Sequence, residues 1–232
     1  MRNMIGCLCI HGFTGSPFEV EPLGNFLKEN TSWIVETPTL PGHGGELARL
    51  RGVAYQDWVQ EAEQSLQGML AKCSTVYLVG FSMGGVISGY LATKYPVKKL
   101  VLLSAAAYYI NPKQLLQDIK EMATEGMRGT LGNNELFQRY RKKIKETPLT
   151  ATFQFQRLVK ELRPTLSQIE VPTLIVQGEL DGIVPVKSAS FLYNTIPSNE
   201  REIVYLPKSK HLVCHDEDRD QLFTTVEKFL IK

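Results

Sequence analysis

One short motif constrains this chain more strongly than its length or its composition. Residues 75–85 read TVYLVGFSMGG, an apolar run that ends in the pattern Gly-x-Ser-x-Gly with Ser82 at its centre. This pattern is typical of a buried strand that turns sharply into a helix and exposes the serine hydroxyl at the bend. Strand and helix can pass close together there only if neighbouring residues lack side chains, and Gly80, Gly84 and Gly85 supply that room. Ser82 is therefore the candidate nucleophile.

The charge of the chain is concentrated in one region. The 232 residues are 43% hydrophobic and 22% charged, with a formal net charge of +2, so nucleic acid is not expected as a partner. Residues 111–163 contain eleven Lys or Arg against six Asp or Glu, which makes this stretch +5 and the remainder of the chain −3. We expect a single domain that carries a basic, surface-rich insert.

The sequence contains no pattern for a membrane span, a metal site or a cofactor. No apolar run reaches the roughly 18 residues that cross a bilayer, and the first apolar stretch lacks the small-residue cleavage site of a signal peptide. The four cysteines have no C-x-x-C spacing, and the four histidines form no zinc-binding pattern. We expect a cytoplasmic protein with reduced thiols, no metal, no cofactor and no integral membrane contact.

Apolar runs and amphipathic segments alternate along most of the chain. Continuous apolar runs, typical of strands buried on both faces of a parallel sheet, lie at residues 4–10, 33–37, 75–79, 99–104, 173–177 and 201–206. Residues 54–72 place apolar side chains at helical intervals of three and four, and a last helix is expected behind the acidic residues 216–218. This alternation predicts an α/β fold with a doubly wound, mostly parallel sheet.

The alternation stops after the predicted strand that ends near Ser104. Residues 105–165 contain helical patterns, around 115–122 and 136–144, but no convincing strand. Helices inserted after a central strand most economically form a small cap over the carboxyl edge of the sheet, where ligands bind in such folds. We expect a core built from residues 1–104 and 166–232 and a helical cap built from residues 105–165. The basic run at 139–145 is either the solvated face of a helix or a peripheral contact with anionic lipid.

A serine nucleophile needs a general base, and that base needs a carboxylate that orients it. His211 follows the last predicted strand across a short loop, so its side chain can hang over the sheet edge. His215 is the alternative base, although its place suits the start of the last helix. Asp181 is the candidate acid in the loop after the fifth predicted strand, and Glu179 in the same loop is its rival.

The reaction of such a serine also requires two backbone N–H groups aimed at the developing oxyanion. We expect one from Met83, the residue after the nucleophile, and one from Phe13 in the loop HGFTG after the first predicted strand. Loss of one such donor raises the barrier by about 3 kcal/mol. The predicted site therefore combines three side chains with two N–H groups.

With these residues assigned, the chain resembles the α/β-hydrolase superfamily, and more narrowly the small bacterial carboxylesterases and monoacylglycerol lipases. The resemblance rests on HGFTGS, PTLPGHG, GFSMGG, the Asp181 loop and His211 before the last helix, in the chain order Ser, Asp, His. It departs at residues 209–211, where Ser-Lys-His stands in place of Ser-Gly-His. The resemblance implies an α/β-hydrolase fold and a serine carboxylesterase that hydrolyses short- to medium-chain carboxylic esters through an acyl-serine intermediate.

Other functions would use the same residues. A monoacylglycerol lipase or a thioesterase needs the same triad, and so does a C–C bond hydrolase or lyase on this scaffold. A ligand receptor that keeps the pocket without catalysis is the alternative outside enzymes. The cap would read the leaving group and the acyl shape, so the substrate stays open at this point. The oligomeric state also stays open.

Overall fold

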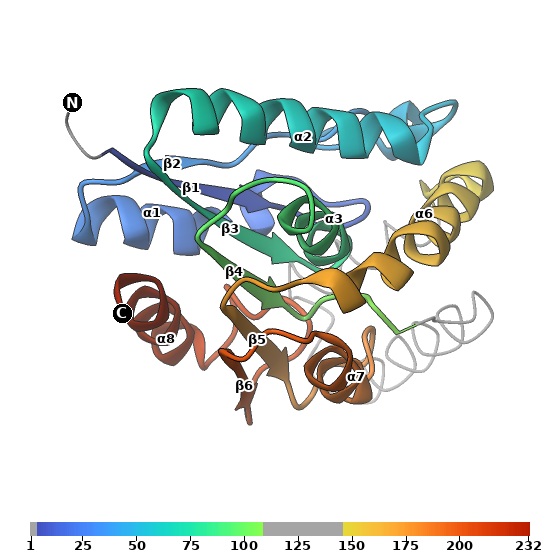
Figure 1. Ribbon diagram of the computed structural model, residues 1–232. Coiled ribbons are helices and arrows are strands. Elements are labelled where there is room, and N and C mark those ends of the chain that lie inside the picture. Colours follow the sequence, from blue (N-terminus) through green and yellow to red (C-terminus); the bar gives the residue numbers. More distant parts are fainter. Residues whose placement is uncertain (1–3, 109–145) are drawn as a thin grey trace.

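One parallel sheet with helices on both faces forms the part of the chain that the computed structural model describes, residues 4–108 and 146–232 (Figure 1). Its six strands follow the order β2-β1-β3-β4-β5-β6, and each neighbouring pair is parallel. The strands are β1 (Ile5–Ile10), β2 (Ile34–Glu36), β3 (Thr75–Phe81), β4 (Lys99–Leu103), β5 (Thr173–Gly178) and β6 (Arg201–Leu206). All six lie where the sequence predicts strands, so the predicted doubly wound α/β sheet is confirmed.

Two hydrophobic clusters occupy the two faces of this sheet. Leu8 and Ile10 of β1 belong to one cluster and Cys7 and Cys9 to the other, because successive side chains of a strand point to opposite faces. The α-helices are α1 (Glu21–Asn30), α2 (Tyr55–Lys72), α3 (Met83–Ala92), α6 (Leu149–Leu162), α7 (Lys187–Thr195) and α8 (Arg219–Ile231). Helices α2, α3, α6 and α7 cover the first face, and α1 and α8 cover the second.

Helices α2 and α8 confirm the two helices that the apolar spacing predicts. The side chains that α2 buries, Trp58, Ala62, Leu66 and Met69, recur at intervals of three and four. Helix α8 begins at Arg219, just behind the acidic residues 216–218. In the described part of the chain, no helix is both long and apolar enough to cross a bilayer.

The predicted cap falls largely outside the described residues. The helical patterns around 115–122 and 136–144 and the basic run at 139–145 all belong to residues 109–145, so the cap stays a prediction there. The described end of the insert forms α6, which packs against α2 and α3 and buries Ala151, Leu158 and Val159. Helix α6 thus continues the helical layer on one face of the sheet.

The carboxyl ends of the parallel strands bring distant segments of the chain to one edge. Strand β1 ends directly before His11, and β3 ends directly before Ser82. The loops after β5 and β6 carry Asp181 and His211. Since β1, β3, β4, β5 and β6 are consecutive in the sheet, these loops can meet.

Candidate active site

Ser82 occupies the turn between β3 and α3 in a strained backbone conformation. Its φ of 53° and ψ of −116° lie where residues with a side chain are rarely found. A Cβ on Gly80 would collide with the backbone of Gly84, and a Cβ on Gly84 would collide with the carbonyl of Ile10. The Ser82 N–H donates to the carbonyl of Leu103 at 2.9 Å, which ties the turn to β4. The glycines around Ser82 therefore have the steric role that the sequence predicts.

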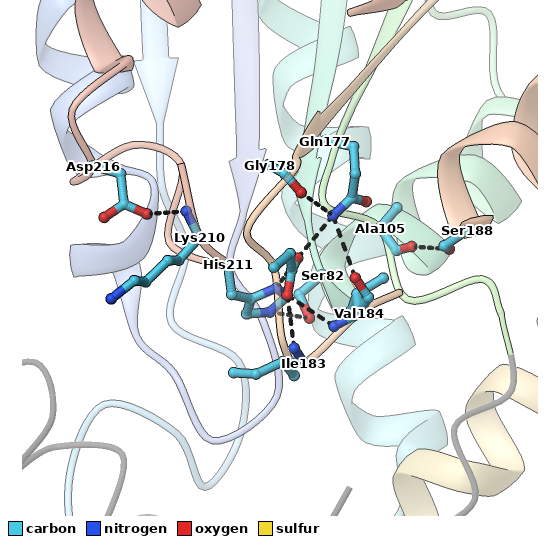
Figure 2. A network of polar contacts seen from close by, with 11 residues as sticks. Ser82, Ala105, Gln177, Gly178, Ile183, Val184, Ser188, Lys210, His211 and Asp216 are labelled. Carbon is cyan, nitrogen blue, oxygen red and sulfur yellow. Dashed lines mark hydrogen bonds and ion pairs between the residues drawn. The ribbon is translucent and has the colours of Figure 1, made fainter. Parts of the chain in front are cut away.

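The structure joins Ser82, His211 and Asp181 in one chain of hydrogen bonds. Figure 2 shows Ser82 beside His211. His211 Nε2 lies 3.1 Å from Ser82 Oγ, and His211 Nδ1 lies 2.8 Å from Asp181 Oδ2. Each of the three residues is only 7% exposed. The predicted nucleophile, base and acid thus meet. Ser82 is less exposed than the motif suggested, and both His211 and Gly12 in the loop after β1 lie against it.

Asp181 is held in one orientation by donors other than the histidine. Its Oδ1 accepts hydrogen bonds from the N–H groups of Ile183 at 2.8 Å and Val184 at 2.9 Å. Its Oδ2 accepts a further hydrogen bond from Gln177 Nε2 at 2.8 Å. Because a carboxylate oxygen accepts, His211 Nδ1 carries the proton, which leaves Nε2 free to accept from Ser82.

Gln177 is a site residue that the sequence analysis missed. It is 1% exposed and lies on β5, where every residue is buried. Its one visible signal was an amide side chain at the end of an otherwise apolar strand. A buried amide must find partners, and Asp181, four residues later, provides one.

The loop that carries His211 is fixed by two acidic residues that follow it. Asp216 Oδ2 accepts from the N–H of Lys210 at 2.7 Å, and Asp218 Oδ2 accepts from the hydroxyl of Ser209 at 2.9 Å. Burial raises the pKa of the Asp216 carboxyl, against the opposing effect of the Lys210 N–H. The Lys210 side chain is exposed and points away from His211 (Figure 2), so its ammonium group does not face the base.

The two alternatives to the acid and the base lie elsewhere. Glu179 is exposed to solvent. His215 Nε2 lies 2.7 Å from the carbonyl oxygen of Phe18, and the two rings stack with centroids 4.2 Å apart. The structure therefore brings His211 and Asp181 to Ser82, and it places His215 and Glu179 in other surroundings.

The loop after β1 lies directly beside Ser82. A Cβ on Gly12 would be 3.0 Å from the Cβ of Ser82. Within the described residues, neither the N–H of Phe13 nor that of Met83 is engaged in a hydrogen bond. No described residue therefore occupies either of the two predicted oxyanion donors. The Phe13 ring stacks on Phe155 of α6, with centroids 4.9 Å apart and 7° between the ring planes.

Among residues 4–108 and 146–232, no three His, Cys, Asp or Glu side chains gather as a metal ion would require. The chemistry that the geometry permits is nucleophilic attack by Ser82, with proton transfer through His211. A strained serine after a parallel strand, hydrogen-bonded to a histidine that bonds to an aspartate, with both partners on loops at the same sheet edge, defines the chain as an α/β hydrolase.

Comparison with known proteins narrows this class. The family described as serine aminopeptidase, S33 (Hydrolase_4) matches residues 6–218, and the chain belongs to this family. The Thermostable monoacylglycerol lipase of Bacillus sp. (strain H-257) is 29% identical over an alignment 243 residues long, gaps included. The alignment covers 98% of this chain and 91% of the relative. The Carboxylesterase of Bacillus subtilis (strain 168) is 25% identical over 226 residues, covering 97% of this chain and 92% of the relative.

Solved structures share the fold. A structure from work on LipS and LipT, two metagenome-derived lipolytic enzymes, matches with a TM-score of 0.80 at 23% identity. The match covers 98% of this chain and 93% of that chain. The α/β-hydrolase fold that the sequence predicts is therefore confirmed.

Proposed function

We propose that this chain is a serine carboxylesterase that hydrolyses short- to medium-chain carboxylic esters through an acyl-serine intermediate. Its family is a hydrolase family, and the relatives named above act as a lipase and a carboxylesterase, which supports the coarser assignment as a carboxylic ester hydrolase. The observation that carries the proposal is the unbroken hydrogen-bond chain from Ser82 through His211 to Asp181.

In the first half of the reaction, His211 Nε2 takes the proton of Ser82 while Oγ attacks the ester carbonyl carbon. The carbonyl oxygen becomes an anion and accepts hydrogen bonds from the N–H groups of Phe13 and Met83. Asp181 holds the ring and stabilises its protonated form. When the C–O bond to the alcohol breaks, His211 returns the proton to the leaving oxygen, and the acyl group stays on Ser82.

In the second half, water takes the place of the alcohol. His211 Nε2 takes a proton from the water as its oxygen attacks the acyl carbon, and the same two N–H groups stabilise the second oxyanion. The bond from the acyl carbon to Ser82 Oγ then breaks, and His211 gives its proton back to Oγ. The carboxylic acid leaves, and the enzyme is restored with no cofactor consumed.

The stacked rings of Phe13 and Phe155 support an apolar acyl group. Both side chains are partly exposed, and Phe13 carries one of the two proposed oxyanion donors. Burial of apolar surface stabilises a bound acyl chain by about 0.8 kcal/mol for each methylene. Peripheral contact with lipid through residues 139–145 stays a prediction, because these residues lie outside the described part of the chain.

The test measures hydrolysis of p-nitrophenyl esters of increasing acyl length by native protein and by Ser82→Ala. We expect the variant to lose at least about a thousandfold in kcat and to resist labelling by a fluorophosphonate probe that labels the native serine. Equal turnover by the two proteins would refute the mechanism. An unlabelled, inactive native protein would instead favour a receptor.

Monoacylglycerol hydrolysis is a second candidate, because one of the relatives reported above is a monoacylglycerol lipase. Comparison of kcat/KM for monoacylglycerols, simple alkyl esters and acyl thioesters of one chain length separates these substrate classes. An aminoacyl p-nitroanilide completes the series, since the family is described as serine aminopeptidase. A higher kcat/KM for the thioester or the anilide than for the oxygen esters would contradict the proposed ester specificity.

A further inference from the structure

Glu19 is a buried acidic residue that the mechanism above does not use. It ends the short 3-10 helix η1 (Pro17–Glu19) and is 5% exposed. Its Oε2 accepts a hydrogen bond from the N–H of Gly12 at 2.9 Å. Gly12 directly precedes Phe13, whose N–H is one of the two proposed oxyanion donors. The carboxyl group of Glu19 therefore bonds to the loop one residue away from that donor.

The loop after β1 leaves room for this carboxyl group. A Cβ on Gly15 would overlap the carboxyl group of Glu19, and a Cβ on Gly12 would lie 3.2 Å from Oε2. A buried carboxyl group is costly unless its oxygens accept hydrogen bonds. The hydrogen bond to Gly12 meets part of that requirement, and it also restrains a residue that has no side chain of its own to fix it.

Gly12 needs restraint because glycine can adopt many backbone conformations. Its carbonyl and the N–H of Phe13 belong to one planar peptide group, so a contact to the carbonyl also orients the N–H. His11 Nδ1 lies 2.9 Å from that carbonyl oxygen. Since His11 Nε2 accepts from the N–H of Leu40 at 3.1 Å, Nδ1 carries the proton and donates. Glu19 restrains the preceding peptide group, so Gly12 is held on both sides.

The segment that contains Glu19 also contacts the loop of the general base. His215 bonds to the carbonyl oxygen of Phe18 at 2.7 Å and stacks on its ring. Phe18 directly precedes Glu19, and His215 follows His211 by four residues. Helix η1 therefore lies between the loop that carries the base and the loop that carries the oxyanion donor.

We propose that Glu19 is a positioning residue that orients the Phe13 N–H toward the developing oxyanion by holding Gly12. The inference rests on the proposed ester hydrolysis at Ser82. A donor that is displaced by about 1 Å can cost on the order of a hundredfold in rate, and complete loss of a donor costs about a hundredfold to a thousandfold in kcat. We therefore expect loss of the Glu19 contact to lower kcat by about a hundredfold or less.

The test compares Glu19→Met with Glu19→Gln in the full-length protein. Methionine keeps the length of the side chain but cannot replace the carboxyl oxygen as an acceptor, whereas the amide oxygen of glutamine can accept from Gly12. We expect kcat to fall about 10- to 100-fold in Glu19→Met with KM within about threefold of native. Glu19→Gln should restore kcat to within about threefold of native. Glu21→Met, which changes an exposed glutamate two residues away, is the matched control and should equal native.

A transition-state analogue separates positioning from a general structural effect. A trifluoromethyl ketone forms a tetrahedral oxyanion on the serine, so its inhibition constant should rise in Glu19→Met by the same factor as kcat falls. Glu19→Asp, which keeps the charge but withdraws the oxygen from Gly12, should give an intermediate loss and serves if Glu19→Met does not fold. The inference would be overturned if Glu19→Met and Glu19→Asp both kept native kcat. It would also be overturned if kcat of Glu19→Gln were no higher than that of Glu19→Met.

Native protein and Ser82→Ala are assayed in the same series. If these two turn over esters equally, the proposed function fails and the inference fails with it. If native protein is active, Ser82→Ala is inactive and the Glu19 variants keep native kcat and inhibitor affinity, the inference alone fails.

Discussion

Replacement of Asp181 by asparagine tests the proposed acid with a change of one atom. The Asp181 Oδ1 position faces the N–H groups of Ile183 and Val184. An asparagine NH2 group placed there would meet two backbone donors that cannot turn. At the Oδ2 position the donors are Gln177 and His211, whose amide can flip and whose ring can change tautomer, so the amide oxygen takes the Oδ1 position. The NH2 group then takes the Oδ2 position and faces His211 Nδ1, which is 2.8 Å from that site in the native protein.

Two donors cannot share a hydrogen bond, so His211 in this variant must change tautomer. Nδ1 becomes the acceptor, and Nε2 carries the proton toward Ser82. A protonated Nε2 cannot take the proton of the serine hydroxyl. The expected loss is about 10⁴-fold in kcat, by analogy with the same change in a serine protease triad, which corresponds to roughly 5.5 kcal/mol in the barrier.

The assay is hydrolysis of the best p-nitrophenyl ester, with Glu179→Gln as the matched control. Glu179 is exposed, two residues from Asp181, and was the rival acid on sequence grounds. We expect the control to keep native kcat, and both variants to keep native circular dichroism because the two backbone hydrogen bonds survive in Asp181→Asn. The acid assignment is wrong if Asp181→Asn loses less than about tenfold while Glu179→Gln loses most activity.

Three further variants test the surroundings of the same histidine. Gln177→Met removes an amide donor from Asp181 and should lower kcat about tenfold, the equivalent of one hydrogen bond, in the same ester assay. Gly178→Ala would place a methyl group against the backbone before His211 and should lower the free energy of unfolding by about 1–3 kcal/mol in urea titrations. Burial raises the pKa of the Asp216 carboxyl in the folded state above its value in the unfolded state. Asp216 therefore contributes fully to the free energy of unfolding below the pKa of the unfolded state, and this contribution is lost as the pH rises through the pKa of the folded state. Asp216→Asn, which keeps an acceptor for Lys210, should therefore gain in urea midpoint relative to native protein as the pH rises from about 4 to 7, and a difference that does not change with pH would contradict this reasoning.

The sequence could predict those parts of the site whose signals are local. A continuous apolar run followed by Gly-x-Ser-x-Gly describes β3 and the strained turn at Ser82 within eleven residues. The hydrogen bond between Asp181 and His211 spans 30 positions. It was predictable because the sequence predicts a strand directly before each loop, and parallel strands end at one edge. Side chains on loops that directly follow parallel strands can thus be assigned to one site before any contact between them is known.

The residues that restrain the site could not be predicted in this way. Gln177 and Glu19 act through side-chain oxygens and nitrogens whose partners depend on local packing, and neither breaks the apolar or helical pattern enough to be singled out. The expected cap also stays a prediction, since most of it falls within residues 109–145, outside the described part of the chain.

Glu19 and Glu21 show why the structure was needed. Both are glutamates at the start of the same helical region, and each suits a helix N-terminus, where acidic side chains are favourable. Glu21 is exposed, as this interpretation requires, whereas Glu19 is 5% exposed and bonds to the loop beside Ser82. The difference arises because Gly12 and Gly15 leave room for the carboxyl group of Glu19, which a side chain at Gly15 would fill. A charged residue beside a glycine-containing loop that borders a nucleophile therefore has two interpretations, and its burial decides between them.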